Sequence, residues 1–222
     1  MKRIIDLSHV IEQGMLTFTA PWHPRVEISI MGRHELEGRE TRRLVLGTHT
    51  GTHIDAPAHF VPGGATIDKT PLEILIGPAY LVEFPQCAPM RQIRIQEVQA
   101  QLPDVSNVKR IVFRFDWSRF WGQEHYYRDW PFLSRDLCQW LIDAGVKLVG
   151  MDTPSPDNPS DNRDSGNDSP RHKLFLENGV TLVEYLSHLD LIAKRCFDLF
   201  ALPLKIRDSD GSPARVVALV DE

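Results

Sequence analysis

The sequence predicts a single α/β domain that spans residues 1–222. Short runs rich in Val, Ile and Phe recur along the chain and are bounded by Gly, Pro or Asp, as strands usually are. Helical segments lie between some of these runs, and strands interleaved with helices are typical of an α/β domain. The composition, with 42% hydrophobic and 25% charged residues, is that of an ordinary globular protein. A chain of this length can bury a substantial core as one unit.

The predicted strands share an apolar run of strand length, and they are distributed over the whole chain. In chain order they are Arg3 to Leu7, Val26 to Met31, Ala79 to Phe84, Arg110 to Phe115, Val146 to Gly150, Asp198 to Leu204 and Arg215 to Val220.

Three segments are predicted to be helical. The clearest runs from Ser134 to Ala144, where apolar side chains recur at i, i+3, i+4 and i+7 and Ser134 is a suitable N-cap. A short helix is expected after Thr70, because Thr70 and Glu73 have the spacing of a capping box. A third helix is expected from Ile95 to Leu102.

The segment from Asp152 to Arg171 differs from the rest of the chain. It reads DTPSPDNPSDNRDSGNDSPR and is nearly free of apolar side chains, so we expect it to lie outside the core. An EF-hand calcium loop that begins at Asp161 is excluded, because Arg163 would fall at the third ligand position. Two alternatives stay open, a surface loop and a lid over a site, since long structureless loops are often functional.

Charge and cysteine content limit the partners that this chain is expected to have. The formal net charge is -5, so a phosphate backbone would not be attracted and a nucleic-acid partner is not expected. The three cysteines form neither a disulfide framework nor a CxxC pair, which suits a cytoplasmic protein. Asp6, His9 and Glu12 interrupt the N-terminal apolar stretch, so we do not expect this stretch to be a signal peptide. No apolar run approaches the roughly 20 residues of a membrane helix, so a membrane is not expected either.

A cluster of histidines marks the segment HTGTHIDAPAHF. His49, His53 and His59 lie within eleven residues, and Asp55 lies among them. On an extended chain these four side chains would share one face, whereas Pro57 disfavours a helix here. Imidazole and carboxylate together suit Zn, Mn and Fe. The pattern therefore predicts a metal site, and the alternative is a group of unrelated surface histidines.

Other ligands must complete the site, because three ligands from one segment leave the coordination of a metal unfinished. Spacing alone does not choose among the remaining histidines, which are His9, His23, His34, His125, His172 and His188. Thr181 and Glu184 have the spacing of a helix capping box. From spacing alone we favour that role for Glu184 and leave His172 unassigned.

The segment from His49 to Phe60 resembles the HxGTHxDxPxHF signature of the cyclase-like metal-dependent hydrolases. This family includes the bacterial kynurenine formamidases (arylformamidases) and is related to isatin hydrolase. Residues 6–8 (DLS), 150–155 (GMDTPS), 202–205 (LPLK) and 211–215 are also similar to the family, so the resemblance covers most of the chain. It implies a mixed β-sheet of the swivelling β/β/α type and a homodimer or a larger homo-oligomer.

The resemblance also implies a set of metal ligands. His49, His53 and Asp55 match the ligands of the first motif, and His172 and Glu184 match a second pair. The set implies two divalent ions per chain, zinc with manganese as the alternative, with both carboxylates touching both ions. This assignment replaces the capping role of Glu184, which we now expect at the end of a strand that leads into a helix.

His59 matches the catalytic histidine of the family, which is not a ligand. A divalent ion lowers the pKa of a bound water toward neutral pH. The hydroxide that forms would attack an amide, lactam or ester carbonyl. His59 would take the proton and give it to the leaving group, since an ordinary imidazole suits both roles. The alternative is a structural residue beside the ligands.

The substrate is expected to contact the N-terminal loop, where formamidases carry a tryptophan in a WPGD-like context. Here Phe18 occupies the corresponding place and Trp22 is displaced, so both are candidate substrate-binding residues. Trp117 and Trp121 are further candidates for an aromatic wall. Each of these four side chains also fits a place in the core.

Three functions remain to be compared. The first is an arylformamidase-like amidohydrolase that acts on a small aromatic or cyclic amide such as N-formylkynurenine, in tryptophan catabolism. The second is a hydrolase or lactonase of the same scaffold with another substrate. The third is a metal-dependent binding protein without catalysis, which is disfavoured because it has no use for His59 beside a complete ligand set.

Overall fold

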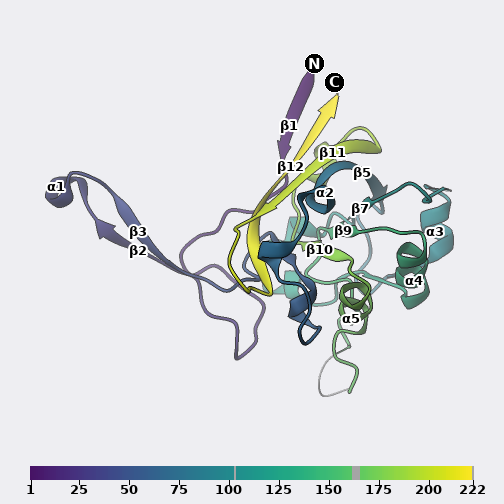
Figure 1. Cartoon of the computed structure of the whole chain (residues 1–222), viewed down its shortest axis with the longest axis horizontal. Coiled ribbons are helices and arrows are strands. Elements are labelled where there is room, and N and C mark those ends of the chain that lie inside the picture. The colour runs from purple at the N-terminus through teal and green to yellow at the C-terminus, as the bar shows by residue number, and fades with distance from the viewer. Residues whose placement is uncertain (103, 162–165, 222) are drawn as a thin grey trace.

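The computed structural model describes residues 1–102, 104–161 and 166–221. Its centre is an eight-stranded mixed sheet with the strand order β1-β12-β11-β5-β7-β9-β10-β4. Strand β12 also pairs with β4, which closes the sheet from β12 to β4 into a barrel-like ring and leaves β1 attached outside it. Figure 1 shows β1 and the end of β12 extending together beyond the body, with both termini at their tips.

The strands of this sheet are β1 (Lys2–Asp6), β4 (His53–Asp55), β5 (Ile76–Glu83), β7 (Arg110–Arg114), β9 (Leu148–Met151), β10 (Thr181–Glu184), β11 (Cys196–Pro203) and β12 (Gly211–Asp221). Two smaller sheets are formed by β2 (Glu27–Gly32) with β3 (Thr41–Val45), and by β6 (Gln92–Ile93) with β8 (Phe132–Leu133). The α-helices are α1 (His34–Glu37), α2 (Leu72–Leu75), α3 (Ile95–Gln99), α4 (Arg135–Asp143) and α5 (Pro170–Glu177).

Hydrophobic residues fill both sides of the ring, because side chains alternate along each strand. In β7, Ile111 and Phe113 join the cluster that contains the buried faces of α3, α4 and α5. Val112 between them joins a second cluster with Leu199 of β11 and Val216 of β12. All five of these side chains are 0% exposed, and burial of one such side chain stabilises a fold by about 1.5–3 kcal/mol.

Each of the predicted strands overlaps a strand of the structure, and the helix predicted from residue 134 is confirmed as α4. The hydroxyl of Ser134 caps α4 by accepting a hydrogen bond from the Leu137 amide at 3.3 Å. The capping box predicted at Thr70 and Glu73 is wrong. Helix α2 has Pro71 at its N-cap position, so Thr70 lies one residue too early to cap it.

The prediction that residues 152–171 lie outside the core is wrong for part of the segment. Asp152, Thr153 and Asp157 are at most 3% exposed, and α5 begins at Pro170. These polar side chains tolerate burial because they are hydrogen bonded. Asp152, for example, accepts bonds from two backbone amides at 2.9 Å. A lid stays a prediction, because residues 162–165 lie outside the described residues.

Strands β2 and β3 form an arm, residues 27–45, that projects away from the body with α1 at its tip (Figure 1). Within the described chain these two strands pair only with each other. Most of their residues are exposed, in contrast to the strands of the ring. Among the described helices, none has the length and apolar character to cross a membrane.

Candidate metal centre

Strand β4 places two of the predicted ligands on one face. Ile54 points into the core of the ring, so His53 and Asp55 on either side of it point the other way. Strand β10 pairs antiparallel with β4, with Glu184 opposite His53. Helix α5, which carries His172, packs against β10. The strand predicted around the first motif is therefore confirmed for His53 and Asp55.

His49 and His59 reach the same place without being part of the strand. His49 lies in the turn before β4, where Gly51 has a φ of 61°, and His59 ends a 3-10 helix that begins at Pro57. The prediction of one extended face is therefore wrong for these two residues, because the chain turns on both sides of β4. The imidazole rings nevertheless converge, with 3.9 Å between the centroids of His49 and His59 and 5.1 Å between those of His49 and His53.

The second pair of predicted ligands completes the cluster. His172 Nε2 lies 3.0 Å from Glu184 Oε1 and 3.4 Å from Asp55 Oδ2. His53 Nε2 lies 3.5 Å from Glu184 Oε2 and 3.3 Å from Asp55 Oδ1, and that same oxygen of Asp55 lies 2.7 Å from His49 Nδ1. Glu184 ends strand β10, so the helix-capping role suggested by its spacing is wrong.

The cluster suits a divalent cation. Asp55 and Glu184 are at most 3% exposed, and the oxygens Asp55 Oδ2 and Glu184 Oε1 are buried without a hydrogen-bond partner in the described chain. His172 Nε2 is close to both oxygens but lacks the geometry of a hydrogen bond to them. A buried carboxylate is stable when it is paired or coordinates a metal. The two unbonded oxygens and the neighbouring imidazole nitrogens therefore form a set of N and O donors of the kind that Zn and Mn accept.

The electrostatics of the cluster favour positive charge. Burial alone would lower the pKa of His49, but the carboxylates of Asp55 and Asp210 raise it to about 10. Burial also opposes a charged His172, yet its pKa is raised well above the usual value by Glu184, Asp157 and Asp55. The excess of buried carboxylates that binds protons so strongly would attract a cation in their place, and metal binding would release those protons.

Neighbouring oxygens hold the far side of each ring. His53 Nδ1 lies 2.8 Å from the carbonyl oxygen of Gly51, and His172 Nδ1 lies 2.6 Å from Asp157 Oδ2. His49 Nε2 lies 2.7 Å from Asp210 Oδ2. Such contacts orient imidazoles and fix which nitrogen faces a metal. Sequence reasoning missed both Asp157 and Asp210. The acidic residues of segment 152–171 were a signal for Asp157, while Asp210 directly precedes a segment similar to the family.

The predicted aromatic wall is only partly at the site. Tyr185 packs on His53 with 4.9 Å between ring centroids, and Trp121 lies 5.8 Å from Tyr185. Phe18 is 42% exposed and lies at the outer edge of this group of rings. Trp22 is 65% exposed on the N-terminal loop.

Trp117 does not line a wall. Its side chain is 0% exposed, so the proposal of a substrate contact there is wrong. The ring belongs to the hydrophobic core, and its indole N–H donates to the carbonyl of Tyr126 at 3.0 Å.

Comparison with known proteins shows the family of this chain. The family model described as "Putative cyclase" matches residues 5–158, which is more than half of the sequence. The chain belongs to this cyclase family. Kynurenine formamidase of Bacillus cytotoxicus is 31% identical over 214 residues, which cover 96% of this cyclase-family chain and 95% of the relative.

Solved structures confirm the predicted fold of this cyclase-family protein. An isatin hydrolase bound to the product analogue thioisatinate superposes with a TM-score of 0.87 at 23% identity, over 100% of this chain and 93% of the other. A potential metal-dependent hydrolase with cyclase activity superposes with a TM-score of 0.78 at 27% identity, over 100% of both chains.

Proposed function

We propose that this chain is a metal-dependent hydrolase that cleaves the C–N bond of a small amide, of the kynurenine formamidase type. The observation that carries the proposal is the cluster of buried carboxylates and imidazoles in which two carboxylate oxygens accept no hydrogen bond from the described residues. Its relatives named kynurenine formamidase match nearly the whole chain, which supports the same reaction class.

The proposed ligands are His49, His53, Asp55, His172 and Glu184. Each carboxylate presents one oxygen to His53 and the other to His172. This division supports two ions per chain, one on the His49 and His53 side and one on the His172 side, with both carboxylates shared. We propose zinc for both ions, with manganese as the alternative, because both accept N and O ligands.

His59 is the proposed proton carrier. A divalent ion at the cluster would activate a water and polarise the carbonyl of the substrate. His59 Nδ1 lies 3.2 Å from Asp210 Oδ2, which leaves Nε2 to receive a proton from the attacking water. The protonated ring then gives that proton to the nitrogen that leaves as the C–N bond breaks. Its side chain is 26% exposed, so a substrate can reach it.

The substrate that we propose is a small aromatic or cyclic amide. Trp121 and Tyr185 extend the row of rings that begins at His53, and Phe18 lies at its outer end through Tyr127. Flat rings of this kind favour an aromatic ligand. Phe18 is therefore the proposed substrate contact of the N-terminal loop, with Trp22 as a second contact at the more exposed end.

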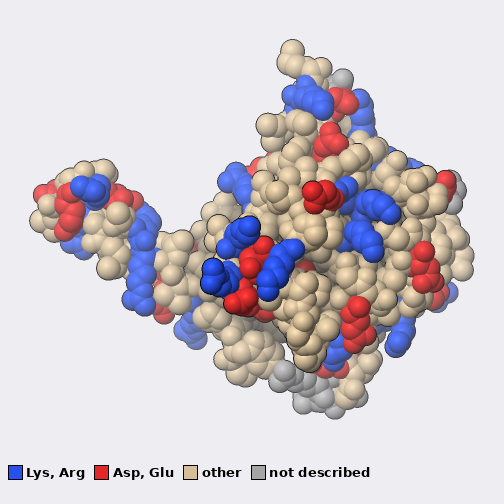
Figure 2. All heavy atoms as spheres, in the orientation of Figure 1, with Lys and Arg blue, Asp and Glu red and all other residues tan. Residues whose placement is uncertain are grey.

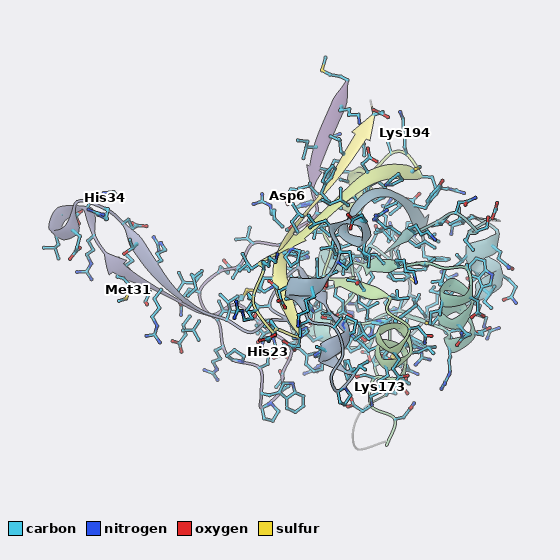
Figure 3. All side chains as sticks on the ribbon, in the orientation of Figure 1. Asp6, His23, Met31, His34, Lys173 and Lys194 are labelled. Atoms are coloured by element: carbon cyan, nitrogen blue, oxygen red, sulfur yellow. The ribbon has the colours of Figure 1, made fainter. Side chains whose placement is uncertain are left out.

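We also propose that the chain forms a homodimer through its arm. A two-stranded hairpin is marginally stable on its own in water. On one face of the arm, Ile30 is 47% and Leu44 is 59% exposed, and Ile28 lies opposite Leu44. Figure 3 shows Met31 out on this arm, well away from His23 in the body. A second copy that covered this apolar face would stabilise the arm.

A cytoplasmic location is proposed from the cysteines. Cys87 and Cys138 are buried free thiols and Cys196 is an exposed one. Free thiols are usual where the compartment is reducing.

The test of the proposed function is hydrolysis of N-formylkynurenine by the protein reconstituted with Zn²⁺ or Mn²⁺. The variant His59→Ala is expected to keep its metal and to lose about 10²–10⁴-fold in turnover, which is the usual contribution of a general acid or base. Loss of metal from His59→Ala would instead make His59 a ligand.

The remaining outcomes separate the alternative functions. A metal-loaded protein that does not hydrolyse N-formylkynurenine would be assayed with isatin, cyclic imides and lactones, and turnover there would mean a different substrate on the same scaffold. Metal binding without turnover of any of these compounds would favour a binding protein and contradict the proposal.

A further inference from the structure

Asp210 joins two histidines that the proposed function gives different roles. Its Oδ2 oxygen lies 2.7 Å from His49 Nε2 and 3.2 Å from His59 Nδ1. The rings of His49 and His59 are only 3.9 Å apart, at an interplanar angle of 31°, so one oxygen reaches both. The same carboxylate thus contacts a proposed metal ligand and the proposed proton carrier.

The backbone around Asp210 is held firmly against the metal centre. The Asp210 carbonyl accepts a hydrogen bond from the Ala56 amide at 2.9 Å, and the Ser209 carbonyl accepts one from the Ile67 amide at 2.8 Å. Gly211 directly follows and pairs with Asp55 in the β12–β4 register. The Asp210 carboxylate therefore projects from a fixed position beside β4.

Gly211 explains how the His49 ring can lie so close to this turn. A Cβ atom at position 211 would lie 2.7 Å from the Ile54 carbonyl oxygen and 2.9 Å from His49 Cε1, both inside normal contact distance. The absence of a side chain lets the imidazole rest on the backbone next to the carboxylate. Gly211 thus leaves room for the ring of His49, and Asp210 contacts its Nε2.

We infer that Asp210 is a positioning residue that orients His49 for metal binding and His59 for proton transfer. The inference rests on the proposed function. With Nε2 of His49 held by Asp210, Nδ1 is directed to Asp55 Oδ1 at 2.7 Å. With Nδ1 of His59 held by the same oxygen, Nε2 is directed away from Asp210. One carboxylate thereby fixes the distance between the metal centre and the proton carrier.

The test compares Asp210→Asn and Asp210→Ala with Asp208→Asn. Asp208 lies on the same turn, its side chain is 71% exposed, and it pairs with Lys69, so it is a matched control. We expect Asp210→Asn to bind Zn²⁺ about 10–100-fold more weakly in competition with a chelator, which is the usual effect of losing a contact that orients a ligand. Asp210→Ala should be weaker still, because the Asn oxygen loses the negative charge but can still accept hydrogen bonds from the imidazoles.

Two further measurements distinguish positioning from other roles. At saturating Zn²⁺ the number of bound ions per chain should equal that of the wild type, while kcat should fall by about 10–100-fold with KM within about twofold. The thermal unfolding midpoint of each variant, measured without metal, checks that the fold is kept.

Three results with the variants would overturn the inference. The first is that both Asp210 variants bind Zn²⁺ with an affinity within twofold of that of Asp208→Asn. The second is the loss of a bound ion at saturating Zn²⁺, which would make Asp210 a ligand. The third is weaker Zn²⁺ affinity with an unchanged kcat, which would show that Asp210 does not orient His59 for proton transfer. Affinity is measured without substrate, so it decides the role toward His49 even if the wild type hydrolyses none of the amides tested. A wild type that bound neither Zn²⁺ nor Mn²⁺ would overturn the proposed function as well.

Discussion

Two antiparallel strand pairs of this molecule have opposite polarity patterns. Strands β4 and β10 are buried along their whole length, yet they carry His53, Asp55 and Glu184. Strands β2 and β3 are mostly exposed, yet they carry the apolar side chains of Ile30 and Leu44 on their surface. Figure 2 shows the arm as a thin projection with Lys and Arg side chains along it, separate from the bulk of the protein.

The contrast indicates that each strand pair binds a different kind of partner. Buried acidic groups are costly unless a counter-charge accompanies them, so β4 and β10 point to a bound cation. An exposed apolar face on a hairpin with no core of its own points to a protein partner. The two regions should therefore respond independently to substitution.

The largest expected effect on turnover comes from a substitution in the buried strand pair β4 and β10. Glu184→Gln keeps the size of the side chain but removes one of the two carboxylates that we propose are shared between the ions. We expect turnover to fall by about 10³-fold or more, because an ion that polarises the carbonyl contributes several kcal/mol to the transition state. Metal content per chain should fall too, as measured by elemental analysis after dialysis.

Glu177→Gln at the exposed end of α5 is the control for this substitution, since it removes the same charge away from the cluster. It should behave like the wild type. Glu184→Gln with full metal content and normal turnover would mean that the buried carboxylate is not a ligand, and the contrast between the two strand pairs would lose its explanation.

A smaller effect is expected from Asp157, which contacts the cluster only through His172. Asp157→Asn should weaken Zn²⁺ binding by about 10–100-fold, because Asp157 Oδ2 holds His172 Nδ1 at 2.6 Å. Asp161→Asn is the matched control, because Asp161 pairs with Arg171 at 2.5 Å from the same segment. Equal Zn²⁺ affinity in the two variants would show that the Asp157 contact does not orient a ligand.

Local sequence patterns predicted most of the central sheet but not the strands that form the site. Runs such as that of β7 are apolar on consecutive positions because both sides of the ring are filled. Strand β4 was expected only as part of a longer extended segment. Strand β10 has the pattern TLVE, which also fits a helix start, and only its pairing with β4 decides between the two.

The ligands were predicted from spacing within the first motif and from family resemblance beyond it. His49, His53 and Asp55 are close in sequence, so a local pattern could reveal them. His172 and Glu184 come from α5 and β10, and only the fold brings them to Asp55. Asp157 and Asp210 contact the proposed ligands but are not ligands in this proposal. An isolated aspartate in a polar segment has no spacing that would reveal such a contact.

The smallest effect on catalysis is expected from the arm. Ile30→Glu combined with Leu44→Glu places two charges on its apolar face, so we expect the dimer to dissociate into monomers at micromolar concentration in sedimentation velocity. Ser29→Glu combined with Arg43→Glu alters the opposite face and should leave the proposed dimer intact. Ser29 and Arg43 pair with each other, and successive side chains of a strand point to opposite faces.

Metal content of both arm variants should match the wild type, because the proposed ligands lie on β4, β10, α5 and the turn before β4. A dimer that survived the change on the apolar face would place the interface elsewhere. Loss of metal on dissociation would instead show that the centre depends on the partner, and the two strand pairs would then form one functional unit.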